Sequence, residues 1–86
     1  MGAYAASKSG VARLTEALAA ELRGRRIRAN AVLPNIIDTP ANRADMPDAE
    51  FGRWVTTGEL AEVIAFLLSD RASGINGASI PVSGRL

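Results

Sequence analysis

One tyrosine and one lysine stand four residues apart near the start of the chain, at Tyr4 and Lys8, and each is the only residue of its type among 86. In a helix this spacing places both side chains on one face. An ammonium next to a phenol stabilises the phenolate, which makes the phenol a usable general acid or base. Most Tyr/Lys pairs at this spacing simply decorate a helix surface, so the spacing alone leaves both interpretations open.

Composition removes most other chemistries. The chain has no cysteine and no histidine, which excludes disulfides, thiol nucleophiles and histidine-based triads, and we expect no metal site. The formal charge of +1, with basic and acidic residues interspersed, predicts neither a nucleic-acid partner nor an anionic membrane surface. The longest apolar stretch, Val63 to Leu68, is far shorter than the roughly 18–20 residues that cross a bilayer. We therefore expect a cytoplasmic protein.

The element that must position Tyr4 and Lys8 is a long helix, predicted over Ala3–Arg23. This segment is rich in strong helix formers and is followed by Gly24, which we expect to end the helix in a left-handed conformation. Large apolar residues fall on one arc of this helix, and we expect that arc to be buried: Val11, Leu14, Leu18 and Leu22.

A strand and a loop follow the helix. The alternating apolar and β-branched run Ile27–Leu33 predicts a strand that ends at Pro34-Asn35. The segment Ile36–Val55 predicts a loop with helical pieces, since Thr39 offers a capping side chain and Pro40 suits the first position of a short helix.

The last third predicts a helix and a closing strand. Thr56 and Glu59 have capping-box spacing ahead of a helix over Thr57–Ser69, and turn residues then lead into a strand over Ala78–Val82. The order is helix, strand, loop, helix, strand, which favours a right-handed parallel βαβ unit. A parallel pair normally belongs to a larger sheet, and a chain this short hides only about 60–65% of its surface. We therefore expect part of a larger domain.

Three blocks of the sequence, in order, resemble the short-chain dehydrogenases/reductases. Tyr4-Ala5-Ala6-Ser7-Lys8 is similar to the Y-x-x-S-K active-site helix of that family, and Ile27–Thr39 resembles its next strand and P-G-x-x-x-T loop. Segments Ala65–Asp70 and Asn76–Gly84 resemble the last helix and strand. The resemblance covers essentially all 86 residues. It implies an α/β chain, residues 1–86 forming a single partial domain, the C-terminal third of a Rossmann-like doubly wound parallel sheet.

The resemblance also implies roles for individual residues. Tyr4 matches the general acid/base of the reaction, and Lys8 matches the residue that stabilises the phenolate and donates to the nicotinamide ribose hydroxyls. Three residues match the loop that holds the nicotinamide carboxamide of NAD or NADP: Pro34, Ile37 and Thr39. The segment Pro40–Val55 matches the substrate lid and carries Met46, Phe51 and Trp54. A locally packed loop is the alternative for that segment.

The chain departs from the family pattern in two places that bear on function. Asn35 replaces the usual glycine after Pro34, which is tolerable if the backbone there is left-handed, since Asn adopts that conformation more readily than most residues. The family's glycine-rich turn, which cradles the diphosphate of the dinucleotide, has no counterpart in these 86 residues.

Two functions therefore remain open. The first is a C-terminal fragment of an NAD(P)-dependent oxidoreductase that acts on a carbonyl/alcohol pair, carries the acid–base residues and is inactive alone. The second is a non-catalytic module that self-associates or docks onto a partner, since family members commonly pair through this long helix and closing strand. Homo-oligomerisation or a complementary N-terminal half would supply the missing surface.

Overall fold

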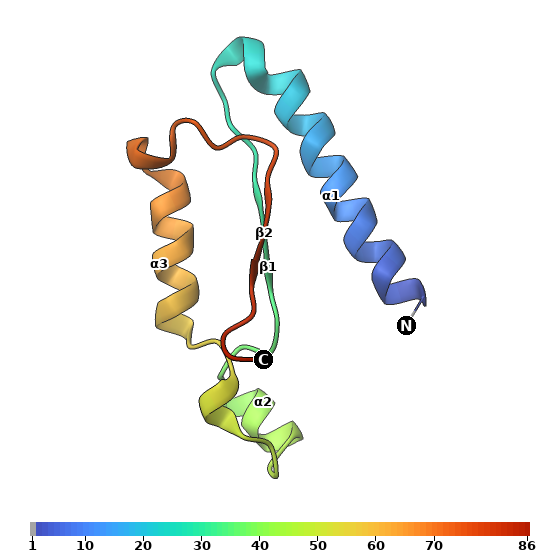
Figure 1. Ribbon diagram of the computed structural model, residues 1–86, viewed down its shortest axis with the longest axis vertical. Helices are drawn as coiled ribbons and strands as arrows, with labels where there is room; N and C mark the ends of the chain where they lie inside the picture. Colours follow the sequence, from blue (N-terminus) through green and yellow to red (C-terminus); the bar gives the residue numbers. More distant parts are fainter. Residues whose placement is uncertain (1) are drawn as a thin grey trace.

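A computed structural model of the protein describes residues 2–86 and confirms the predicted order of elements. Two strands pair in parallel, with Ala31 opposite Ser79 and Pro34 opposite Val82. Figure 1 shows one long helix on one side of the strands and a shorter helix on the other. The elements are α1 (Gly2–Leu22), β1 (Ala31–Pro34), α2 (Pro40–Asp45), α3 (Thr57–Leu68) and β2 (Ser79–Val82), with 3-10 turns at Arg23–Arg25, Phe51–Arg53 and Asp70–Ala72.

The end of α1 differs from the prediction. The helix continues into the 3-10 turn Arg23–Arg25, so Gly24 lies inside that turn and is not its left-handed terminal residue. Arg26 takes that conformation instead, at φ 59° and ψ 34°, and its N–H donates to the Arg23 carbonyl. Because the turn adds residues before the chain reverses, the left-handed position falls beyond the glycine. A residue with a side chain is strained there.

The face of α1 that meets the strands is also not the predicted one. Thr15 and Ala19 are buried, and a β-carbon built on Gly77 would lie 3.3 Å from the Ala19 methyl group. Because α1 passes so close to the connection that leads into β2, only small side chains fit between them. The larger apolar side chains of α1 therefore lie on another face of the helix. The row expected to be buried is instead exposed by 45% at Val11, 61% at Leu14 and 39% at Leu18, with only Leu22 half-buried.

Strand β1 begins at Ala31, four residues later than the predicted start at Ile27. Side-chain amides take the place of the strand ladder just before it. Asn30 donates to the Ile75 carbonyl at 3.0 Å and accepts from the Ala78 N–H at 2.9 Å. The chain therefore runs alongside the segment before β2 without forming regular strand pairs until Ala31.

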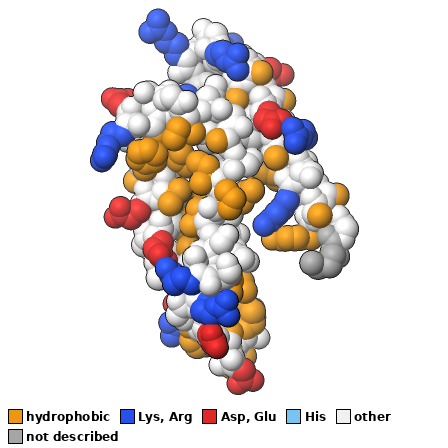
Figure 2. Space-filling view, in the orientation of Figure 1, with side chains coloured by type: hydrophobic (Ala, Val, Ile, Leu, Met, Phe, Trp, Pro, Cys, Tyr) orange, Lys and Arg blue, Asp and Glu red, His pale blue; other side chains and the backbone are white. Residues whose placement is uncertain are grey.

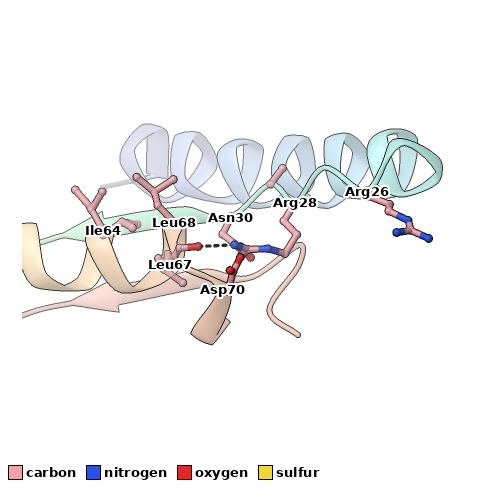
Figure 3. Close-up of a pocket in the computed structure, with 9 residues that line it drawn as sticks. Arg26, Arg28, Asn30, Ile64, Leu67, Leu68 and Asp70 are labelled. Atoms are coloured by element: carbon pink, nitrogen blue, oxygen red, sulfur yellow. Dashed lines mark hydrogen bonds between the residues drawn. The ribbon is translucent and has the colours of Figure 1, made fainter. Parts of the chain in front are cut away.

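Arg28 ties this segment to the end of α3. Its guanidinium donates to three backbone carbonyls, of Leu67 at 2.8 Å, Ile75 at 3.2 Å and Ser69 at 3.3 Å, and Figure 3 shows the first of these bonds. Carbonyls at the end of a helix lack partners within the helix, and a cation there also opposes the helix dipole. Arg28 thus fixes α3 against the strands.

Helix α3 and strand β2 agree with the sequence to within one residue. The Thr56 hydroxyl accepts from the Glu59 N–H, and the Glu59 carboxylate accepts from the Thr56 N–H, which completes the predicted capping box. The buried apolar residues are few and mostly small: Ala19, Trp54, Val55, Leu67 and Ala72. Among residues 2–86, no helix is long and apolar enough to cross a membrane.

Replacing Arg26 by glycine should stabilise the protein, because glycine adopts the left-handed conformation without a steric penalty. We expect Arg26→Gly to raise the free energy of unfolding by about 1 kcal/mol, or the melting temperature by roughly 4–8 °C. Thermal unfolding followed by circular dichroism measures the change. The control, Arg25→Gly, lies in the right-handed 3-10 turn and should not stabilise. Equal effects of the two variants would contradict the assignment of strain to Arg26.

Candidate active site

Tyr4 and Lys8 lie together on the first turns of α1. The Lys8 ammonium nitrogen sits over the Tyr4 ring, 4.8 Å from its centroid, as the four-residue spacing predicts. Tyr4 is 57% exposed and Lys8 is half-buried. Within residues 2–86, neither the Tyr4 hydroxyl nor the Lys8 ammonium has a hydrogen-bond partner. Both polar groups are therefore available to a ligand.

The part of α1 that carries this pair stands away from the strands. The buried residues of α1, Thr15 and Ala19, are in its second half, and Figure 1 shows the helix slanting away from β1 toward its N-terminal end. Tyr4 and Lys8 therefore face solvent on a surface to which residues 2–86 add no opposite wall.

The second group of predicted residues lies where β1 ends. Pro34 is the last residue of β1, Ile37 forms a parallel bridge with Val55, and Thr39 precedes α2. Ligands of open parallel sheets bind beyond the carboxyl ends of the strands, so this is the expected place for a cofactor loop. The backbone at Asn35 is not left-handed, so it does not require glycine, and the Asn35 N–H donates to the Val82 carbonyl at 3.1 Å. That bond continues the strand pairing by one residue.

Asn42, which the sequence did not single out, organises this loop. Its backbone N–H donates to the Thr39 hydroxyl oxygen at 3.1 Å, and its side-chain amide donates to the Ile37 carbonyl at 2.7 Å. Thr39 is thus the N-cap of α2, as its place before Pro40 predicted. The Thr39 hydroxyl proton and the Ile37 N–H remain without an acceptor in the described part of the chain. These two donors are therefore free to bind a ligand.

The segment after the loop is packed on itself. Asp38 accepts two bonds from the Arg43 guanidinium, at 2.7 and 2.9 Å, which lower the pKa of Asp38. Arg43 also lies over the Phe51 ring at 4.5 Å, and the Phe51 and Trp54 ring centroids are 5.0 Å apart. These contacts match the locally packed alternative for this segment, and its role as a substrate lid stays a prediction.

The two groups of predicted residues are not joined to each other. Figure 1 shows the N-terminal end of α1 and the loop after β1 toward the same end of the strands. No hydrogen bond or ion pair within residues 2–86 connects Tyr4 or Lys8 to the loop. The predicted site residues therefore form two separate groups on the described chain.

Arg85 is the polar residue with the most partners near the loop, and sequence reasoning missed it. Its guanidinium forms a two-pronged ion pair with Glu59, at 2.7 and 2.9 Å, and also donates to the carbonyls of Trp54 and Gly52, at 2.8 and 3.1 Å. The capping box indicated a role for Glu59, but a pairing between residues so far apart leaves no local signal.

A hollow of about 470 Å³ lies elsewhere, between α3 and β1. Its apolar lining comes from Val32, Ile64 and Leu68, and Figure 2 shows hydrophobic side chains gathered over α3 and the strands. Figure 3 shows Arg28 in this hollow, where it is engaged with backbone carbonyls. The hollow therefore has an apolar part, and the charged side chains of Arg26 and Asp70 also line it. Within residues 2–86, no group of three or more His, Cys, Asp or Glu side chains lies close enough together to hold a metal ion.

Comparisons with known proteins place the sequence among reductases. A family profile described as Enoyl-(Acyl carrier protein) reductase matches residues 1–84. The 3-oxoacyl-(acyl-carrier-protein) reductase of Pseudomonas aeruginosa is 41% identical over 90 residues, which cover 94% of this chain and 36% of that protein. The chain thus spans little more than a third of this relative.

Solved structures agree. A short-chain type dehydrogenase/reductase from Mycobacterium ulcerans superposes with a TM-score of 0.82 at 33% identity, covering 98% of this chain and 34% of that one. A 4-hydroxyisoleucine dehydrogenase complexed with NADH gives a TM-score of 0.74 at 30% identity, with 96% and 37% covered.

Because Arg85 pairs with Glu59, we expect the free energy of unfolding to fall at acid pH. Hydrogen bonds from Arg85, and then from the Thr56 N–H, lower the pKa of Glu59 from 4.5 to about 2. A carboxyl whose pKa is lower in the folded state contributes stability above the unfolded value, and this contribution is lost as the pH falls from 4.5 toward 2. Glu59→Gln should therefore lower the urea midpoint at pH 7 and match the wild type near pH 2.

The matched control is Glu62→Gln, an exposed change on the same helix. Its effect on the urea midpoint should be small at both pH values. A Glu59→Gln deficit that is equally large at pH 7 and pH 2 would show that the ion pair does not contribute.

Proposed function

The chain belongs to the short-chain dehydrogenase/reductase family, and on this premise we propose that it forms the acid–base and nicotinamide-loop part of an NAD(P)-dependent oxidoreductase. The observation that carries the proposal is the placement of Lys8 over Tyr4 at one helix end, with both polar groups unpartnered in residues 2–86. The substrate class is a carbonyl compound or the corresponding alcohol.

The proton transfer is the part of the reaction that this chain supplies. The Tyr4 hydroxyl donates its proton to the carbonyl oxygen in reduction and takes it back in oxidation. The Lys8 ammonium stabilises the phenolate that remains and offers its other protons to ribose hydroxyls. A bound nicotinamide cofactor supplies or accepts the hydride, so that one hydride and one proton together convert C=O to an alcohol.

The loop after β1 fits one end of such a cofactor. The Ile37 N–H and the Thr39 hydroxyl proton are donors without acceptors in the described residues, which suits a carboxamide oxygen. The chain offers no comparable site for the diphosphate of the cofactor, since the sequence has no glycine-rich turn ahead of a helix. We therefore propose that residues 1–86 alone neither bind the dinucleotide tightly nor turn over substrate.

A complementary N-terminal half is the partner that the uncovered surfaces fit. Ala31 and Asn35 donate to β2, so in a parallel ladder the peptide of Val32 between them faces the opposite, free edge of β1. The hollow between α3 and β1, whose lining includes the apolar residues Ile64 and Leu68, adjoins that edge through Val32. A further parallel strand with its helix would fill both. The relative from P. aeruginosa has nearly two thirds of its length outside the matched region.

Self-association is the second candidate function, and a separate observation favours it. The apolar row of α1 is exposed along about two turns at Val11, Leu14 and Leu18. Contiguous apolar rows of this kind on monomers usually mark an interaction site. A second copy of the same helix, packed antiparallel against the row, would bury it without using the strands.

A chimera tests the catalytic proposal. In it, residues 1–86 replace the matched region of the P. aeruginosa reductase, and oxidation of NADH and NADPH is followed with a 3-oxoacyl thioester. We expect activity in the chimera and none with residues 1–86 alone. Tyr4→Phe should lower kcat/KM of the chimera by about 10²–10⁴-fold, because the general acid is lost.

The matched control for Tyr4→Phe is Ser9→Ala, an exposed change on the same helix that should leave the rate unchanged. An active chimera that tolerates Tyr4→Phe would contradict the role of Tyr4. Saturable micromolar binding of either dinucleotide to residues 1–86 alone would contradict the need for a complementary half.

Sedimentation velocity tests the self-association candidate. We expect the wild-type chain to form dimers or larger species, and Leu14→Glu to weaken that association by at least about tenfold because it places a charge in the apolar row. The matched control is Ala20→Glu, which adds the same charge to an exposed position on the opposite side of α1 from the row. A wild-type chain that stays monomeric at high concentration would rule this candidate out.

A further inference from the structure

The last residues of the chain clamp the base of the loop that follows β1. The Arg85 guanidinium uses four of its N–H donors: two on the Glu59 carboxylate, one on the Trp54 carbonyl and one on the Gly52 carbonyl. The Arg85 backbone N–H donates to the Arg53 carbonyl at 2.9 Å. One residue thus joins the start of α3 to the backbone of the segment before it.

Gly84 brings the tail into direct contact with the same backbone. Its φ is +65°, and a β-carbon built on it would lie 2.9 Å from the Arg53 oxygen, the Trp54 carbonyl carbon and the Val55 nitrogen. A side chain does not fit at that distance, so Gly84 lets Arg85 reach its acceptors. Tail and segment lie backbone against backbone.

The other side of this segment holds the proposed nicotinamide loop. The Val55 N–H donates to the Ile36 carbonyl at 3.1 Å, and the Asp38 N–H donates to the Val55 carbonyl at 2.7 Å. Val55 is fully buried and Trp54 is 2% exposed. The backbone at Val55 therefore lies between the tail and the loop. It contacts both, so a shift of the tail should also shift the loop.

The remaining hydrogen bonds of the loop are local. Asp38 pairs with Arg43, and Asn42 bonds to Ile37 and Thr39, all within or beside α2. These bonds shape the loop but do not fix it relative to α3. Beyond the end of β1, the two hydrogen bonds with Val55 fix the loop relative to α3. Arg85 in turn anchors the segment that contains Val55 to the start of α3.

We propose that Arg85 is a positioning residue, which acts through Trp54 and Val55 to hold the Ile37 N–H and the Thr39 hydroxyl where they meet the nicotinamide carboxamide. This inference rests on the proposed function. Arg85 itself does not touch the cofactor. Its loss should loosen one end of the loop and weaken cofactor binding, while the proton transfer by Tyr4 continues.

The first test measures amide hydrogen exchange on residues 1–86 with Arg85→Met. We expect exchange at Val55 and Asp38 to accelerate by at least about tenfold, which is the effect of losing roughly 1.4 kcal/mol of local stability. Exchange at Ala31, which donates to β2, should not change. The matched control is Arg71→Met, an exposed arginine with no hydrogen bond or ion pair among residues 2–86.

The second test measures steady-state kinetics of the chimera described above. Arg85→Met should raise the KM for the dinucleotide by about tenfold with kcat within about twofold, since only positioning of the cofactor is affected. Arg85→Lys keeps the charge but not the planar fork, so it should fall between wild type and Arg85→Met. If Arg85→Met does not fold, Arg85→Lys decides in both tests.

The outcomes separate the two levels of the proposal. Unchanged exchange at Val55 and Asp38 would overturn the clamp. Faster exchange with an unchanged KM in an active chimera would overturn the link to the cofactor and leave the proposed function standing. A wild-type chimera without activity would overturn the proposed function, and with it the positioning of a cofactor.

Discussion

A parallel pair of strands needs cover on both faces, and this requirement shapes the whole molecule. The chain covers one face with α1 and the other with α3, but only partly. Helix α1 contacts the strand layer through Thr15 and Ala19 and then diverges. What stays uncovered is the apolar row of α1, the hollow beside α3 and the free edge of β1, which presents backbone N–H and C=O groups. A further strand with its helix, or a second copy of the chain, would bury such surfaces.

The same requirement explains why the candidate site is divided. Tyr4 and Lys8 are placed by a helix whose first half has no strand beneath it, whereas the loop with Ile37 and Thr39 is held by hydrogen bonds. Lys8 therefore lies over Tyr4 as the proposed proton transfer requires, but nothing in residues 2–86 fixes the pair against the strands, whereas the loop is fixed and would hold only one end of the proposed cofactor. A larger sheet would fix the position of the Tyr4/Lys8 pair relative to the loop.

Much of the site follows from local sequence. Four-residue spacing brings Lys8 to Tyr4, and Thr39 before Pro40 begins α2. The backbone at Asn35 is not left-handed, and its N–H continues the pairing with β2. The network of Arg85 escaped prediction because its acceptors are mostly backbone carbonyls, which every residue has, and they lie far away in sequence.

The sequence by itself determined the order of elements, the capping box of α3 and the family, because helix periodicity, caps and short motifs are local properties. Only the tertiary structure decided which face of α1 meets the strands, since the close approach at Gly77 admits Ala19 and excludes the leucines. It also placed the start of β1 and the partners of Arg85. Those depend on distances between segments that are remote in the chain, and no local pattern encodes them.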